Sequence, residues 1–222
     1  MSLTACLIPT FDVLTEEQIS LINNNSHIIQ HKSGELIFMQ DRPVSHLIYL
    51  KSGLIKLYMK VEEKKEIIVD VMGDNQFIGL AAIFYENLYP YSISSIEAGE
   101  LVYIDAKIFR DILIENGAYA VKIMAELSSR IVFLMNRMAA LTHKQVPGRL
   151  AEMLLYFSKE IYKNREIQLP LTRQEIADLV QTSKETVSRT LTEFKNDRII
   201  ELDERKVTLK SIELLEVLNK IG

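Results

Sequence analysis

The sequence predicts an α+β protein in which an N-terminal antiparallel β-roll, jelly-roll-like in type, precedes a helical half. Three observations predict this fold class. Short segments of alternating polar and apolar residues fill the first half of the chain. Apolar residues then recur at steps of three and four after Gly117, and two capped helices with two short strands follow Pro147.

The composition is typical of a soluble globular protein. The chain has 222 residues, of which 48% are hydrophobic and 25% charged, so it has room for one large or two modest domains. No apolar run reaches the roughly 20 residues that a membrane span needs, and no secretion signal is present, so we expect a cytoplasmic protein without a membrane partner. The single cysteine, Cys6, excludes an internal disulfide and a cluster held by cysteines alone. With a formal net charge of −4, DNA binding would require basic residues grouped on one face, because screening limits phosphate attraction to about 8 Å.

One helix is predicted before the roll. It covers 15–24, with Thr15 as its N-cap and Glu17 and Gln18 in its first turn. Ser52 and Gly53 lie between two apolar segments and are predicted to form a hairpin turn. Period-two alternation predicts strands at 36–39, 47–50, 54–58, 67–71, 93–96 and 101–104.

A long central helix is predicted after Gly117. Six apolar residues recur with coiled-coil spacing over nearly three heptads and form the candidate dimer interface. A helix packed only on its own domain would explain one such stripe. A second apolar stripe favours pairing with an identical helix, with one stripe facing the roll and the other facing the partner. The first stripe is Met124, Leu127, Ile131, Leu134, Met138 and Leu141; the second is Val121, Val132, Met135 and Ala139.

The segment from Val146 to Arg149 interrupts this helix, because proline lacks a backbone donor and glycine loosens the chain. The sequence therefore divides into a β-roll domain at 1–115, a dimerisation helix at 116–145 and a third domain at 146–222. A helix at 149–162 is predicted to open the third domain.

The third domain has the pattern of a winged helix-turn-helix. Thr172 and Glu175 have capping-box spacing, and Ser183 is a natural N-cap for a second helix after a short turn. Strands at 199–202 and 206–209 would form the wing. The apolar positions of the first helix are Ile176, Ala177, Leu179 and Val180, and those of the second are Val187, Leu191 and Phe194.

The polar face of the second helix carries Glu185, Ser188 and Arg189. In a helix-turn-helix, the N-terminal part of this helix enters the DNA major groove. Arg189 could donate to guanine O6 and N7, and Glu185 could accept from cytosine N4. The i,i+4 spacing would also let Glu185 hold Arg189 straight.

An exposed ion pair without a DNA role is the alternative for these two residues. The surrounding caps, turn, apolar positions and wing favour the DNA role. Phosphate contacts are expected near the N-termini of both helices. The candidate phosphate contacts are Arg173, Gln174, Ser183, Lys184 and Thr186.

The stretch "LTRQEIADLVQTSKETVSRTLTEFKNDRIIEL" resembles the DNA-binding motif of the Crp/Fnr family of bacterial transcription regulators. "GELIFMQDRPVSHLIYLKSGLIKLY" resembles that family's cyclic-nucleotide-binding-type β-roll, and "FIGLAAIFYENLYPYSISSIEAGELVYI" occupies the place of its effector cassette. The resemblance implies a homodimer that binds double-stranded DNA and contacts RNA polymerase. It implies that Glu185 and Arg189 contact a G·C pair and its neighbour, and "E-x-x-S-R" resembles the Fnr branch, which adds Ser188 and a TTGA-like half-site.

Three departures from the family argue against cyclic AMP as the effector. One lies in the central helix, where members that bind it offer Thr and Ser to the adenine and an ungapped match here gives Leu134 and Met135. The other two lie in the cassette. Members that bind it carry a glutamate after the cassette glycine and an arginine for the phosphate. Here Leu80 follows Gly79, and Tyr91 follows Pro90. A buried cyclic phosphate would lack its cationic partner, which is strongly unfavourable. The iron–sulfur cluster of the Fnr branch is also argued against, because it needs four cysteines.

An apolar pocket is expected instead, and two interpretations of it stay open. It could bind an apolar or flat effector such as haem, or its side chains could be plain core without an effector. No cofactor is certain, and no axial-ligand motif supports the histidines, which are His27, His31, His46 and His143. The candidate pocket residues are Gly79, Leu80, Ala81, Phe84, Tyr91, Ser92, Leu134 and Met135.

An enzyme is not expected. The sequence has no glycine-rich phosphate loop, no metal-spaced cluster and no nucleophile motif around Cys6. The roll could in principle regulate a kinase or a channel, but the chain has neither a kinase motif nor a membrane span. The sequence therefore predicts a DNA-binding transcription regulator gated by an effector other than cyclic AMP.

Overall fold

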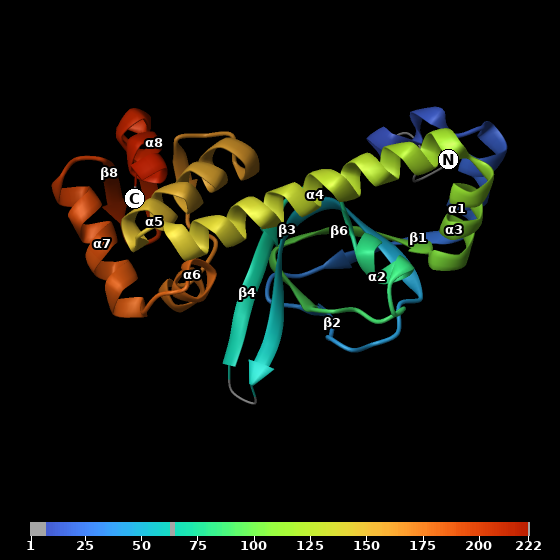
Figure 1. Ribbon diagram of the computed structural model, residues 1–222, viewed down its shortest axis with the longest axis horizontal. Coiled ribbons are helices and arrows are strands. Elements are labelled where there is room, and N and C mark those ends of the chain that lie inside the picture. Colours follow the sequence, from blue (N-terminus) through green and yellow to red (C-terminus); the bar gives the residue numbers. More distant parts are fainter. Residues whose placement is uncertain (1–7, 63–64, 222) are drawn as a thin grey trace. The chain divides into compact units, whose positions relative to one another are not determined.

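The computed structural model describes residues 8–62 and 65–221, so Cys6 lies outside the described residues (Figure 1). The chain forms two compact units, one of Met1–Lys64 with Val71–Phe133 and one of Lys65–Asp70 with Leu134–Gly222. The elements are, in chain order, η1 (Pro9–Val13), α1 (Glu16–Asn24), β1 (Ser26–His31), β2 (Leu36–Phe38), β3 (His46–Glu62), β4 (Lys65–Met72), β5 (Gln76–Ile78), α2 (Leu80–Phe84), β6 (Ser92–Asp105), α3 (Ala106–Glu115), α4 (Gly117–His143), α5 (Val146–Tyr156), η2 (Phe157–Ile161), β7 (Glu166–Gln168), α6 (Arg173–Val180), α7 (Lys184–Asn196), β8 (Ile200–Asp203), β9 (Lys206–Leu209) and α8 (Ile212–Ile221). No helix among these residues has both the length and the apolar character that crossing a membrane requires.

The predicted antiparallel roll is confirmed. The sheet has the order β1-β6-β3-β4, with β2 added to β6 and β5 added to β3. Strand β6 pairs antiparallel with β1, β2 and β3. The apolar side chains of the roll form two clusters. One includes Ile48, Leu57 and Ile93; the other is completed by Phe109 of α3 and Tyr119 of α4.

The predicted hairpin turn at Ser52 and Gly53 is wrong. Strand β3 pairs with β6 on both sides of Gly53, and the register shifts there, which marks a β-bulge. Gly53 has a φ of 108°, and a Cβ on Gly99 of β6 would lie 1.9 Å from the Ser52 carbonyl oxygen. Glycine is needed because two backbones approach closely at a bend. The predicted strands at 93–96 and 101–104 are one strand for the same reason, because β6 bends with its partner.

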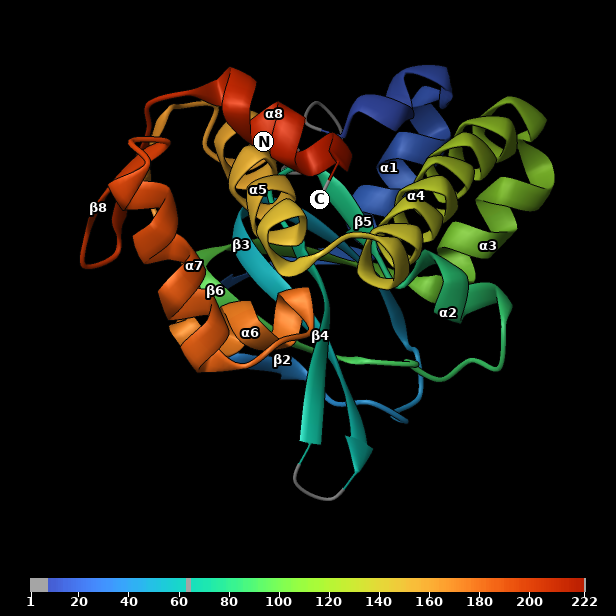
Figure 2. The same ribbon diagram turned by 60° about the vertical axis from the view of Figure 1, so that its left-hand side comes forward.

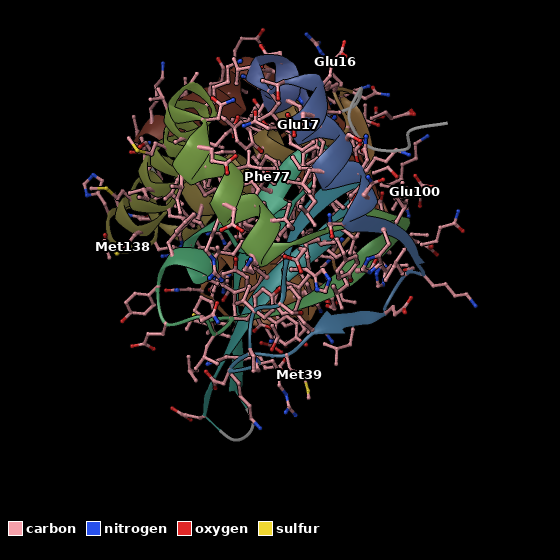
Figure 3. The ribbon with its side chains drawn as sticks, turned by 90° about the vertical axis from the view of Figure 1, so that its right-hand side faces the viewer. Glu16, Glu17, Met39, Phe77, Glu100 and Met138 are labelled. Carbon is pink, nitrogen blue, oxygen red and sulfur yellow. The ribbon has the colours of Figure 1, made fainter. Side chains whose placement is uncertain are left out.

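Thr15 caps α1 as predicted. The Thr15 hydroxyl accepts a hydrogen bond from the Gln18 N–H, and the Gln18 side chain accepts one from the Thr15 N–H, both at 3.2 Å. The helices then cover the sheet through aromatic contacts. Phe77 of β5, which Figure 3 labels, contacts both Tyr49 of β3 and Phe109 of α3. The ring centroids are 5.0 Å and 6.2 Å apart, respectively.

The central helix α4 is one continuous helix, as predicted (Figure 1). Helix α5 begins at Val146 rather than at the predicted residue 149, and it ends before a π-helical turn at Phe157–Ile161. Pro147 lies in the first turn of α5, where a missing N–H costs no intrahelical hydrogen bond. Pro147 is therefore part of the first turn of α5, and the helix does not have to begin after it.

The C-terminal segment contains the predicted two helices, α6 and α7, and the predicted wing strands β8 and β9 (Figure 2). The wing sheet has the order β7-β9-β8. Strand β7 and helix α8 are not among the predicted elements. Strand β7 is only three residues long, and no glycine or proline separates the wing from α8.

Candidate nucleic-acid interface and effector region

Helix α6 is fixed at both ends by local hydrogen bonds. At its N-terminus the predicted capping box is present: the Thr172 hydroxyl accepts from the Glu175 N–H at 3.2 Å, and Glu175 Oε2 accepts from the Thr172 N–H at 2.8 Å. At its C-terminus Gln181 adopts a φ of 51°, and its N–H donates to the Ala177 carbonyl. This left-handed residue lets the chain turn toward α7 within a few residues. The four predicted apolar positions of α6 are buried.

Replacing Thr172 with alanine should destabilise the protein by about 1 kcal/mol, because the Glu175 N–H in the first turn of α6 loses its acceptor. The measurement is urea unfolding followed by circular dichroism. Thr192→Ala is the matched control, since the Thr192 hydroxyl bonds to the Ser188 carbonyl within α7 and caps no helix. Equal unfolding midpoints for the Thr172→Ala variant and the unchanged protein would contradict the capping role.

Helix α7 has the predicted division into a buried and an exposed face. Val187, Leu191 and Phe194 are buried, and so is Thr190, while Glu185, Ser188 and Arg189 are exposed. Ser183 caps the helix as predicted, because its hydroxyl accepts from the Thr186 N–H at 3.1 Å. Three polar side chains therefore lie on one face of a helix whose opposite face is fixed in the core.

Arg189 pairs with Glu193 and not with Glu185. Arg189 Nε lies 3.8 Å from Glu193 Oε1, and both side chains are exposed. The expectation that Glu185 holds Arg189 is therefore wrong. The carboxylate of Glu185 turns back to the start of α7, where hydrogen bonds from its own backbone N–H and from Ser183 lower its pKa. The positive end of the helix dipole favours a carboxylate at this position, which explains why Glu185 bonds there and not to Arg189.

The five predicted phosphate contacts have different surroundings. Arg173 donates to the Glu204 carbonyl at 3.0 Å, and Gln174 donates to Asp178 Oδ1 at 2.9 Å. Ser183 and Thr186 bond to each other within the cap. Lys184 is exposed, and its ammonium group has no hydrogen bond or ion pair within the part of the chain that the structure describes. Of these five residues, Lys184 is therefore the one whose side chain is most accessible to a DNA phosphate.

Arg205 of the wing is a structural residue that the sequence patterns do not reveal. Its Nε donates to the Leu169 carbonyl at 3.1 Å, and its Nη2 donates to the Pro170 carbonyl at 2.9 Å. These bonds tie the wing to the segment before α6. Arg205 is 36 residues from Leu169 in sequence, so no local spacing signals the contact.

The predicted effector-pocket residues of the roll and of α4 differ in their burial and in their contacts. Leu80 is buried in the roll core, whereas Ala81 and Phe84 are exposed. Tyr91 packs on the core cluster of Ile48 and Ile93, and burial raises its pKa to about 12, against a hydrogen bond with the Gly79 backbone that lowers it. A neutral phenol thus occupies the place that the family resemblance assigns to a cationic arginine. Ser92 Oγ accepts from the Gln40 N–H at 2.9 Å, and Leu134 and Met135 lie exposed on α4.

Five exposed apolar residues of α4 follow a heptad register that differs from the predicted one, whereas Val132 and Leu134 are exposed outside this register. Leu127 packs against the roll core, and Leu141 is half-buried. Together with two exposed hydroxyl residues, these five positions repeat at alternating steps of three and four. The two hydroxyl groups bond back to carbonyls of their own helix. We call this set the α4 seam; it consists of Val121, Met124, Ser128, Ile131, Met135, Met138 and Thr142.

Comparisons with known proteins place both halves of the chain. Residues 148–218 match the Crp-like helix-turn-helix domain, and residues 28–116 match the cyclic nucleotide-binding domain. The chain is 26% identical over 190 residues to the cAMP-activated global transcriptional regulator CRP of Escherichia coli, covering 84% of this chain and 90% of that protein. The CRP-like cAMP-activated global transcriptional regulator of Mycobacterium tuberculosis is 24% identical, with 92% and 93% covered.

Solved structures agree with this assignment at the level of the fold. A putative transcriptional regulator of the Crp/Fnr family from Eubacterium rectale has a TM-score of 0.80 at 22% identity, with 97% of this chain and 99% of that chain covered. FixK2 from Bradyrhizobium japonicum has a TM-score of 0.81 at 18% identity, with 89% and 98% covered. The order of roll, central helix and helix-turn-helix, the exposed polar face of α7 and both domain matches lead to one conclusion: the chain belongs to the Crp/Fnr family of DNA-binding transcription regulators.

Proposed function

We propose that the protein acts as a homodimer on an inverted repeat with TTGA-like half-sites. The observation that supports this most directly is the row formed by Glu185, Ser188 and Arg189 on the exposed face of α7. Arg189 can donate to guanine O6 and N7 from this face, and Glu185 can accept from cytosine N4. In a dimer, two copies of α7 would enter successive major grooves about 34 Å apart.

The α4 seam supports the dimer. Met124 and Met138 are 62% and 65% exposed, and Ile131 is 51% exposed, which is unusual for large apolar side chains on one helix. Figure 3 labels Met138 on this helix. Their heptad register is the register with which two helices pair. We propose this seam as the dimer interface in place of the six residues predicted from sequence, of which Met124, Ile131 and Met138 are retained.

We further propose that any effector of the roll is not cyclic AMP. Leu80 and Tyr91 provide neither an anion for the ribose nor a cation for the phosphate. A second candidate is a regulator that needs no effector. The packing of Tyr91 against the core, with Phe38 stacked on Tyr89 at 3.7 Å between ring centroids, favours this second candidate.

The histidines do not fit haem as an effector. Three of them surround Tyr103 in the sheet: His27 stacks on it at 5.2 Å between centroids, His31 Nε2 lies 3.2 Å from its hydroxyl, and His46 packs edge-on against it at 6.1 Å. His46 Nδ1 also bonds to Ser45 at 2.9 Å. His143 is exposed on the last turn of α4. Each ring of the roll is already engaged, so the proposed function contains no haem.

A mobility-shift experiment tests the proposed function. The purified protein is titrated onto a TTGA-type inverted repeat with a six-base-pair spacer and onto a scrambled duplex, without any added nucleotide. Preference for the inverted repeat supports the proposal, and equal affinity for the two duplexes defeats it. RNA polymerase remains a partner that the family implies, and no residue is assigned to that contact.

Two further measurements test the effector proposals. Calorimetry with cyclic AMP should show no binding, and micromolar binding would contradict the argument from Leu80 and Tyr91. Absorbance spectra after haem addition should show no shifted Soret band. A shifted band would show that a histidine of this protein can bind haem iron after all.

A further inference from the structure

Two arginines from outside the helix-turn-helix bond to its turn. Arg137 of α4 donates from Nη2 to the Leu179 carbonyl at 3.0 Å. Arg149 of α5 donates from Nη2 to the Gln181 carbonyl at 3.3 Å and from Nη1 to the Leu141 carbonyl of α4 at 2.9 Å. Leu179 lies in the last turn of α6, and Gln181 lies in the turn that leads to α7. The two side chains therefore join α4 and α5 to the end of α6 and to the turn that precedes α7.

The chemistry of this contact favours a fixed geometry. The last carbonyls of a helix lack intrahelical donors and form its negative end, where cations are stabilised. The guanidinium of Arg137 is largely buried, and burial lowers its pKa, opposed by the nearby charge of Glu152. A buried cation persists only when its partners hold it in good geometry. Arg137 is thus better fixed than an exposed arginine on a flexible stem.

Further bonds strengthen the same joint. Lys144, which directly follows α4, donates to Glu152 of α5 at 2.6 Å and to Asn219 of α8 at 2.5 Å. The connection at 145–148, where the sequence shows a break, is therefore bridged by side chains from both sides. The seam residues Met135 and Met138 lie on either side of Arg137 in the sequence. One turn of α4 therefore carries both the proposed dimer contact and the bond to the Leu179 carbonyl.

We propose that Arg137 and Arg149 are positioning residues that fix α7 relative to α4 and thereby set the distance between the two recognition helices of the dimer. The inference rests on the proposed function. Neither arginine needs to touch DNA for this role. Together they determine which spacer length between half-sites the dimer accepts, whereas Glu185, Ser188 and Arg189 determine which bases it accepts.

Spacer length is a sensitive probe of this role. Each added base pair moves the second half-site by about 3.4 Å along the duplex and rotates it by about 35°. A dimer with fixed recognition helices should lose affinity steeply when the spacer changes from six to five or seven base pairs. A dimer whose helices pivot at the turn should tolerate the change.

The test compares the unchanged protein with the Arg137→Gln variant on inverted repeats with spacers of five, six and seven base pairs. The unchanged protein should prefer six by about tenfold or more, and Arg137→Gln should reduce this preference to about threefold or less, because a bond to a charged group is lost. Both proteins should keep the same preference for the TTGA-like half-site over a scrambled one. Arg165→Gln is the control for charge, since Arg165 is exposed and its guanidinium has no bond within the described residues.

A variant that keeps the charge separates positioning from folding. Arg137→Lys should show intermediate spacer preference, because lysine lacks the planar fork that reaches a carbonyl at a fixed angle. Should Arg137→Gln lose its circular dichroism signal, Arg137→Lys and Arg149→Gln carry the comparison. If the unchanged protein prefers six base pairs and the folded arginine variants prefer it equally, the positioning role is wrong and the proposed function stands. If the unchanged protein does not discriminate TTGA-like DNA, the proposed function itself is wrong.

Discussion

The Arg189→Ala variant is expected to bind TTGA-like and scrambled duplexes almost equally well. Arg189 is 69% exposed on α7, and its only ion pair among the described residues is the long one to Glu193, so the guanidinium is available for a guanine. A bidentate base contact is worth about 1–3 kcal/mol of discrimination, and a dimer makes two of them. The specificity ratio should therefore fall by roughly 30-fold to 10⁴-fold.

Lys184→Ala is the matched control, because it also removes one cation from the first half of α7. Lys184 is expected to contact phosphate, so this variant should bind all duplexes more weakly and keep the specificity ratio. Its slope of log affinity against log salt should fall by about two, one counterion for each half-site. Anisotropy titrations at several salt concentrations measure both quantities. An equal loss on specific and random DNA in both variants would contradict base contact by Arg189.

The C-terminal segment has no excess of positive charge, which helps an experiment to separate base contacts from phosphate contacts. Acidic and basic residues are equal in number between Val146 and Gly222. Several of the basic residues are engaged inside the protein, such as Arg173 with the Glu204 carbonyl and Lys210 with Glu201. Non-specific attraction to phosphate should therefore be weak, and base contacts should supply a large share of the total affinity.

Local rules explain why the helix-turn-helix could be predicted from the sequence. The capping boxes and N-caps at Thr15, Thr172 and Ser183 act within three residues, so a local pattern contains all the interacting groups. The buried positions of α7 follow from helical periodicity in the same way. The family resemblance then implied the roles of Glu185 and Arg189, which no local pattern contains.

Contacts between distant segments explain what could not be predicted. Ser52 and Gly53 have the composition of a hairpin turn, and only the approach of Gly99 shows that they form a bulge. The bonds from Arg137 to Leu179 and from Arg205 to Leu169 span 42 and 36 residues. Spacing alone allowed Glu185 to pair with Arg189 or with the N-terminus of α7. In the structure its carboxylate bonds at the N-terminus, with its own backbone N–H and with Ser183.

The register of α4 was only partly predictable. Apolar residues cover more than one face of this helix, so periodicity alone allows several heptad registers. Leu127 packs on the roll core whereas Ile131 is exposed, and this difference favours the proposed α4 seam. This difference determines where a disruptive substitution should be made.

Replacing Ile131 with glutamate should convert the proposed dimer to monomers at micromolar concentration. Ile131 lies in the middle of the α4 seam, so two copies would face each other across the interface. Loss of two buried isoleucine side chains costs about 3–6 kcal/mol, which weakens association by roughly 100-fold to 10⁴-fold. Two facing carboxylates add desolvation and repulsion to this cost.

Light scattering coupled to size-exclusion chromatography measures the mass of each variant. Ser129→Glu is the control, because Ser129 is exposed on the opposite side of the same helix and the new charge is the same. It should remain dimeric and should still bind the inverted repeat. The Ile131→Glu monomer should bind a single half-site with the base preference of Arg189 intact, but it should lose the gain in affinity from a second half-site. A dimeric Ile131→Glu variant would show that α4 pairs through another face, and the seam would then have to be sought among Leu134 and Leu141 instead.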